Sequence, residues 1–382
     1  MATDQTKSKV GVDLSRFETQ ISKTGFVLEN SIASQLRAGG WTVISNRYYV
    51  DDHEETVREI DLVAYKATKV QDVQVYTSLI ISCKKSEQNA WALLARPLDP
   101  KDPNADWWPL HAWTNDPAIN YELGLHGTGK RYHDELNAGG FSEVLQLPQV
   151  EVFAFQEMDR SSGAPKNDKP IFDSITSLMK AQSYELTALP MRRKDAGPCL
   201  YQFNLLSIAD TDLLRLQFDG DSVKAEPIES EHYIARYIVR KKATFSRIRF
   251  IKADGFSKHL ADYDRLHVAN CRWFLDQQER FYKEVLKDTG RTSVFAERFR
   301  ADLGWYLFYR IGRNFSANAD LSDLAVEWRR EQAVPAITAM FSNEQLAFIS
   351  NNADCRLRAS LALKEVYKYE GAFIFDRPEI PF

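Results

Sequence analysis

The hydrophobic periodicity of the chain changes near Lys258, and this change limits the possible folds more than any other feature of the sequence. Before it, apolar and polar residues alternate in short segments rich in β-branched and aromatic residues, which is typical of strands. After it, apolar residues recur at helical spacing, as in "YDRLHVANCRWFLDQQERFYKEVL" and "LRASLALKEVYKYE". The pattern predicts an α+β protein with a mixed central sheet, followed by a helical region.

The predicted elements divide the chain into three parts. A polar N-terminal arm is expected at 1–20, an α/β domain at 21–255 and a helical C-terminal domain at 256–382. Between about 95 and 147 the periodicity is lost and prolines are frequent, so we predict a loop-rich insertion with short helices. Helices are expected at 25–39 and 170–181, and strands at 41–50, 58–65, 75–85, 150–156, 200–206, 213–218, 233–239 and 247–251.

The composition is that of an ordinary globular protein. With 382 residues, 44% of them hydrophobic, the chain is long enough for two or three hydrophobic cores. No apolar run approaches the roughly 20 residues of a membrane span, and the N-terminus lacks the apolar segment of a signal peptide. The cysteines lie far apart in the sequence, which is typical of reduced thiols. We therefore expect a cytoplasmic protein that is not associated with a membrane.

Glu29 occupies an unusual place on the first predicted helix. It shares one stripe of that helix with Ile32, Ala33 and Leu36, according to the spacing of residues that face the same side. A carboxylate on an apolar stripe is costly unless it is paired or lies where water or a metal ion can reach it. The position of Glu29 therefore marks it as a candidate functional residue.

Two predicted strands place further polar residues together. In "REIDLVAY" Glu59 and Asp61 face one side, and in "LIISCKKS" Ser82 and Lys84 face one side. If the opposite faces of both strands pack on a core, these four side chains gather on one face of the sheet, and Glu29 approaches from the helix. Carboxylates at a strand end can hold Mg²⁺ or Mn²⁺, which activates water, and a lysine can stabilise the charge that develops on a phosphate.

The order of these residues resembles the PD-(D/E)XK restriction-endonuclease-like superfamily. The run "REIDLVAY…LIISCKKS…W" is similar to Mrr-like and resolvase-like members, and the resemblance covers residues 25–91. It implies an αβββαβ core with a mixed sheet, in which Asp61 and the carbonyl group of Cys83 bind the metal ion, Glu29 assists and Lys84 is catalytic. It also implies a Mg²⁺- or Mn²⁺-dependent nuclease acting on DNA, in defence against foreign DNA, repair or recombination.

One position departs from the pattern of the family. Ser82 stands where the family has an acidic metal ligand, and a neutral hydroxyl group is a weaker ligand. Glu59, on the same strand face as Asp61, is a candidate replacement. Three interpretations stay open: a nuclease with a rearranged set of carboxylates, a nuclease-like module that binds nucleic acid or a partner without cutting, and a chance resemblance in which these charges are simply solvated.

Basic residues suggest where nucleic acid would bind. The segment "YIARYIVRKKATFSRIRFIK" contains no acidic residue, although it could also be a solvated hairpin that pairs with acids elsewhere. "GLHGTGKR" fits the GxxxxGK part of a phosphate-binding loop, but Arg131 replaces the required Ser or Thr and no clear strand precedes it. The predicted nucleic-acid contacts are Lys85, Lys130, Arg131, Arg236, Arg240, Lys241, Lys242, Arg247 and Arg249. The C-terminal helices are candidates for homodimer or partner contacts.

Overall fold

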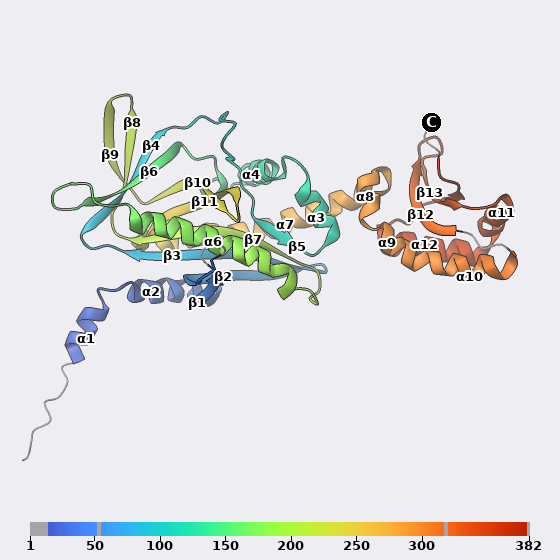
Figure 1. Cartoon of the computed structure of the whole chain (residues 1–382), viewed down its shortest axis with the longest axis horizontal. Helices are drawn as coiled ribbons and strands as arrows, with labels where there is room; N and C mark the ends of the chain where they lie inside the picture. Colours follow the sequence, from blue (N-terminus) through green and yellow to red (C-terminus); the bar gives the residue numbers. More distant parts are fainter. Residues whose placement is uncertain (1–13, 52–54, 317–319, 380–382) are drawn as a thin grey trace, which may run out of the picture. The chain divides into compact units, whose positions relative to one another are not determined.

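A computed structural model describes residues 14–51, 55–316 and 320–379 (Figure 1). The chain forms two compact units, one of residues 1–115 and 129–271 and the other of residues 116–128 and 272–382. Both units combine helices and sheets, which confirms the α+β class. Most of the predicted arm at 1–20 lies outside the described residues, and its last part is the helix α1 (Leu14–Ile21).

A mixed sheet forms the centre of the first unit. Its strands lie in the order β1-β2-β3-β7-β11-β10, with β5 paired to β7. β1, β2 and β3 are antiparallel neighbours, β3, β7 and β11 run parallel, and β10 runs antiparallel to β11. The bounds are β1 (Thr42–Val50), β2 (Val57–Val70), β3 (Val73–Lys85), β5 (Ala112–Thr114), β7 (Cys199–Asp210), β10 (Ser230–Val239) and β11 (Lys242–Lys252).

Helices cover both faces of this sheet. The helix α6 (Lys169–Arg192) packs on one face, where its apolar side chains join a core cluster with Ile80 of β3. The buried stripe of α2 (Gly25–Ala38) is absent from that cluster, which places α2 on the opposite face. The first half of α7 (Phe256–Glu284) lies on the same side as α2. Its His267 and Asn270 bond to Thr77, and the side chains of Thr77 and Ile80 face opposite sides of β3.

A second sheet belongs to the same unit. It has the order β6-β4-β8-β9, built from β4 (Asn89–Pro97), β6 (Val150–Asp159), β8 (Leu213–Asp219) and β9 (Ser222–Ile228). The predicted insertion at 95–147 therefore begins at the end of a strand, and it contains the short helices α4 (Thr128–Ala138) and α5 (Ser142–Leu145). β4 and β9 were not predicted, and α6 is 24 residues long, twice the predicted length.

The second unit is not purely helical, so that part of the domain prediction is wrong. It contains a sheet of the order β12-β13-β14, from β12 (Asp320–Arg329), β13 (Val334–Met340) and β14 (Ile374–Asp376). The predicted boundary at residue 256 also differs, because the first half of α7 belongs to the first unit and residues 116–128 belong to the second. The helices here are α3 (Pro117–Gly124), α8 (Thr289–Val294), α9 (Ala296–Phe299), α10 (Trp305–Asn314), α11 (Asn343–Asn351) and α12 (Ala353–Tyr367).

Candidate active site

Asp61 lies where the pairing between β2 and β3 ends. The last residue pair of the ladder between these strands is Leu62 and Ile81, and Asp61 is the residue that precedes Leu62 in the sequence. Beyond that point the Oδ2 atom of Asp61 accepts a hydrogen bond of 2.6 Å from the backbone N–H of Cys83. The carboxylate thus takes the place of a strand-to-strand hydrogen bond, and this bond holds Asp61 beside the C-terminal end of β3.

Lys84 follows directly on β3 and reaches the same carboxylate. Its Nζ atom lies 3.8 Å from Oδ2 of Asp61, and its side chain is 34% exposed. This separation is longer than a hydrogen bond, and the pair is partly exposed, so it contributes little to stability. The ammonium group is instead in a position to meet a ligand that also approaches Asp61.

Glu29 brings a second carboxylate to this place from α2. It forms no hydrogen bond and no ion pair with any other described residue, and it is half-buried. Its pKa is raised, first by burial and then by the negative charge of Asp61, while the charge of Lys84 acts in the opposite direction. The helix and the two strands therefore bring Glu29, Asp61 and Lys84 within electrostatic reach of one another.

Glu59 stands at the margin of this group. It is exposed, and its carboxylate accepts a hydrogen bond from the side chain of Asn46 on β1. Its charge contributes to the raised pKa of Glu29, although less than burial and Asp61 do. Asn46 was not predicted from the sequence; it has a positive φ of 54°, a conformation that Asn adopts more readily than most residues.

Ser82 and Cys83 contribute little through their side chains. Ser82 is 1% exposed and lies in register with Ser207, which bonds to Ser174 of α6, so Ser82 faces the α6 side of the sheet. Its hydroxyl group has no hydrogen-bond partner among the described residues. The Cys83 thiol is buried, and burial, reinforced by the charge of Asp61, raises its pKa well above the ordinary value. The thiol is therefore neutral and a poor metal ligand. The group of Cys83 that could bind a metal ion is its backbone carbonyl.

These groups fit Mg²⁺ in kind and number. Magnesium is usually held by one or two carboxylates and keeps several of its waters, so Asp61 and Glu29 with a backbone carbonyl group would suffice. A bound cation would also offset the repulsion that raises the pKa of Glu29. Within residues 14–51, 55–316 and 320–379 no three His, Cys, Asp or Glu side chains form a metal site, so a fully protein-ligated centre is not built here.

The raised pKa of Glu29 leads to a prediction about stability in the absence of metal. Between the ordinary value of 4.5 and the raised value, the folded state keeps a proton that the unfolded state has lost, so the free energy of unfolding decreases as pH rises through this window. We expect Glu29→Gln to be more stable than the wild type at pH 7.5, by less than about 1 kcal/mol because the group is partly solvated, and this gain to vanish below pH 4.5. Thermal unfolding with a chelator measures the difference.

Glu18 provides the matched control for this measurement. It is an exposed glutamate on α1, so Glu18→Gln is expected to leave the thermal midpoint unchanged over the same pH range. A Glu29→Gln variant that unfolds at the same temperature as the wild type at every pH would contradict the electrostatic coupling of Glu29 and Asp61.

The predicted basic contacts are not grouped around these carboxylates. Lys85 is already engaged, because its Nζ atom donates to the carbonyl group of Ser22 and pairs with Glu87 at 3.3 Å and Asp210 at 3.8 Å. Lys130 pairs with Asp134 on α4 and lies over the ring of Trp108. The preceding element is a helix, α3, so this segment lacks the strand that a phosphate-binding loop requires.

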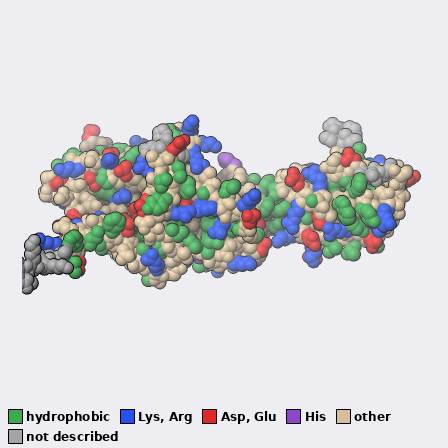
Figure 2. Space-filling model, turned by 60° about the horizontal axis from the view of Figure 1, so that its bottom comes forward, with side chains coloured by type: hydrophobic (Ala, Val, Ile, Leu, Met, Phe, Trp, Pro, Cys, Tyr) green, Lys and Arg blue, Asp and Glu red, His purple; other side chains and the backbone are tan. Residues whose placement is uncertain are grey.

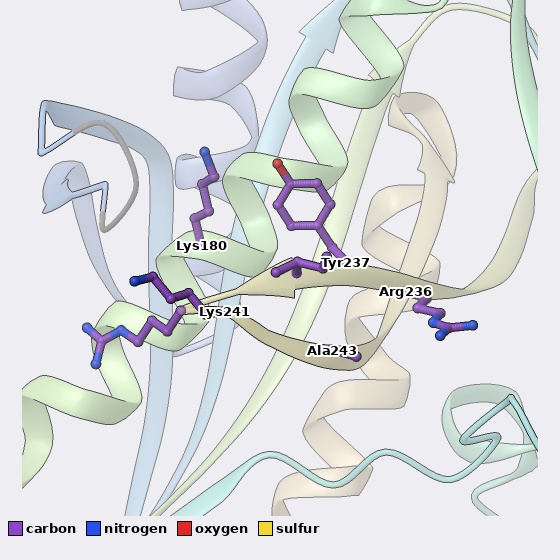
Figure 3. A pocket seen from close by; sticks show the side chains of 7 residues that line it. Lys180, Arg236, Tyr237, Lys241 and Ala243 are labelled. Carbon is purple, nitrogen blue, oxygen red and sulfur yellow. The ribbon is translucent and has the colours of Figure 1, made fainter.

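The hairpin between β10 and β11 lies at the other end of the sheet from Lys84. Both Lys84 and Lys252 pair with Ala209, and Lys242 begins β11 ten residues earlier, roughly 33 Å away at 3.3 Å per residue. Arg240 and Lys241 form the tip with positive φ angles. Figure 3 shows Lys180 on α6, Lys241 at the tip of the hairpin, and Tyr237 and Arg236 pointing in different directions from β10; these residues line a hollow of about 970 Å³.

Arg247 and Arg249 are structural residues, so their assignment to nucleic-acid binding is wrong. Arg247 donates to the carbonyl groups of Gln146 and Trp107, and burial lowers its pKa to about 10. Arg249 is 3% exposed and bonds to Asp262 and His259. Both guanidinium groups satisfy buried acceptors and are withheld from a ligand at the surface.

No family model, curated protein or solved structure matches this chain. In the described residues, no helix combines the length and the apolar character that a membrane span requires.

Proposed function

We propose that the chain is a metal-dependent nuclease that hydrolyses phosphodiester bonds in DNA. One observation carries the proposal: the carboxylate of Asp61, held by the N–H of Cys83, lies 3.8 Å from the ammonium group of Lys84 and within electrostatic reach of Glu29. Two carboxylates beside a lysine are the groups needed to hold a divalent cation and to stabilise a scissile phosphate.

The order of the elements supports the same proposal. The elements α2, β1, β2, β3, α6 and β7 follow the helix–strand–strand–strand–helix–strand order of the restriction-endonuclease-like core, apart from the segment 89–159. β7 lies beside β3 and parallel to it, and the candidate residues lie at the end of β3 that such a core uses for its chemistry. We propose that residues 25–210 form this core.

The proposed roles follow from the surroundings of each residue. Asp61 and Glu29 would hold Mg²⁺ or Mn²⁺, which supplies an activated water and offsets the charge of the phosphate. Lys84 is placed to bind the same phosphate, or to orient the water, at the end of β3. The buried, unpartnered hydroxyl of Ser82 supplies no charge to this cluster, so we assign Ser82 no role as a metal ligand.

A binding module without cleavage is the second candidate. It is favoured by Ser82 and by the finding that, in the part of the chain that the structure describes, no three potential ligand side chains converge. Such a protein would bind nucleic acid without a requirement for metal.

Cleavage assays on supercoiled plasmid and on single-stranded DNA separate the two candidates. We expect the purified chain to cut at least one substrate with Mg²⁺ or Mn²⁺ and to lose this activity with a chelator, because two partly solvated carboxylates hold Mg²⁺ reversibly. Calorimetric titration should detect binding of Mn²⁺. DNA binding without cleavage or metal binding would favour the binding module, and cleavage that persists in the chelator would exclude the metal-dependent mechanism.

A further inference from the structure

The second unit exposes a row of aromatic side chains on α10. Trp305 is 73% exposed, which is unusual for a side chain of this size, and Phe308 and Tyr309 are each 47% exposed. In contrast, Leu307 and Ile311 of the same helix are fully buried in the core of this unit. The aromatic residues therefore belong to the solvent face of the helix, and packing within the unit does not account for them.

These rings are arranged as a stack along the helix. Trp305 and Tyr309 are one helical turn apart, and their rings are nearly parallel, with an interplanar angle of 9° and centroids 5.8 Å apart. Arg313, one turn further, lies over the Tyr309 ring at 5.2 Å. Their spacing of four residues places Trp305, Tyr309 and Arg313 in one row on the helix surface.

A π-helical turn precedes this row. Residues Arg300–Gly304 form a π-helix between α9 and α10. Such a turn inserts a residue and shifts the helical phase that follows, and π-turns occur frequently at functional sites. Here the helix after the shift buries Leu307 and Ile311 and leaves Trp305 and Tyr309 outside.

The row of rings ends at a positive charge. Residues 297–313 contain four arginines, one glutamate and one aspartate. Asp302 is neutralised by Arg358, and Arg310 pairs with Asp354. Arg313 is exposed and has no carboxylate partner among the described residues, so its positive charge remains beside the Tyr309 ring. Figure 2 shows hydrophobic side chains at the surface of this unit, with both basic and acidic side chains among them.

We propose that this surface binds single-stranded nucleic acid, with bases stacking on Trp305 and a phosphate meeting Arg313. A single strand offers both exposed ring faces and negative charge, whereas a duplex hides the faces of its bases. An apolar protein partner would use the rings but would leave Arg313 without a counter-charge. The choice of nucleic acid as the ligand rests on the proposed function, and the inference extends it by naming single-stranded segments as the form that the second unit recognises.

Binding of a fluorescently labelled thymidine oligonucleotide to the full chain, measured by anisotropy with a chelator present, tests this proposal. We expect Trp305→Leu to bind about tenfold more weakly, because it keeps an apolar side chain but loses the ring on which a base stacks, and Trp305→Phe to stay within about threefold of the wild type. Arg313→Gln should reduce the slope of log affinity against log salt by about 0.7, the value for one phosphate contact with a single strand.

The controls separate stacking from other causes. Met340→Ala removes another exposed apolar side chain of the same unit, 64% exposed, and should leave oligonucleotide binding unchanged. Equal binding by Trp305→Leu and the wild type would overturn the inference. A change in association state on substitution of Trp305, without a change in oligonucleotide binding, would also overturn it and identify a second copy of the chain as the occupant.

The same measurement keeps the two proposals distinguishable. Because binding is measured without divalent metal, a chain that never cuts DNA but binds the oligonucleotide through Trp305 would refute the nuclease proposal and leave this surface intact. A chain that cuts DNA, and whose Trp305→Leu variant binds the oligonucleotide as tightly as the wild type, would support the nuclease proposal and refute the role of this surface.

Discussion

Replacing Asp61 by asparagine is expected to lower the rate of Mg²⁺-dependent cleavage by about 10²–10³-fold, the range seen when one electrostatic contact to a reacting centre is removed. Asparagine keeps a carbonyl oxygen that can accept the hydrogen bond from the N–H of Cys83, so the local fold should be preserved. What is lost is the negative charge that would hold the cation. Initial rates of plasmid cleavage over a range of Mg²⁺ concentrations measure the effect.

The control for Asp61→Asn is the same substitution at a remote aspartate. Asp219 is exposed at the end of β8, so Asp219→Asn should cut at the wild-type rate. Thermal unfolding of both variants checks that each is folded. A wild-type rate for Asp61→Asn would remove the basis of the proposed function, since no other described carboxylate is bonded to the end of β3 in this way.

The second large effect is expected at Lys84. Lys84→Met keeps most of the length of the side chain but removes the ammonium group that lies 3.8 Å from Asp61, and we expect a loss of about 10²-fold in cleavage rate. Stability should change little, because a partly exposed ion pair of this length contributes less than about 1 kcal/mol. The loss should appear in the maximal rate at saturating Mg²⁺, since the cation is held by the carboxylates.

Lys85 offers a matched control one residue away. Its ammonium group is held by the carbonyl group of Ser22 and by Glu87 and Asp210, so it is directed away from Asp61. Lys85→Met is therefore expected to keep a cleavage rate within about threefold of the wild type, although it loses local ion pairs. Equal losses in the two lysine variants would mean that general positive charge, and not the position of Lys84, supports cleavage.

The outcome for individual residues shows how far each kind of sequence signal extends. The apolar stripe of Ile32, Ala33 and Leu36 on α2 was predicted from helical spacing and is buried as expected. Periodicity succeeds for this stripe because it depends only on the geometry within one helix. The charge of Asp61 also contributes to the raised pKa of Glu29, but this contact depends on how α2 packs on the sheet and not on the periodicity of either element.

Basic residues were a poorer guide. The same segment of sequence holds Arg240 at an exposed hairpin tip and Arg249 in the interior, where Asp262 and His259 satisfy it. Nothing in the local pattern separates the two, since a buried arginine depends on partners that come from distant parts of the chain. The strands of the second unit were missed for a related reason: their burial depends on neighbours in the sheet more than on their own alternation.

By itself, the sequence determined the α+β class and the apolar stripe of α2. The tertiary structure alone decided that β11 runs parallel to β3, so that the basic hairpin and Lys84 lie at opposite ends of the sheet. It also decided that the hydroxyl of Ser82 is buried on the α6 side. The physical reason is that local periodicity sets which side of an element is apolar, whereas the pairing and direction of strands are set by packing between residues far apart in the chain.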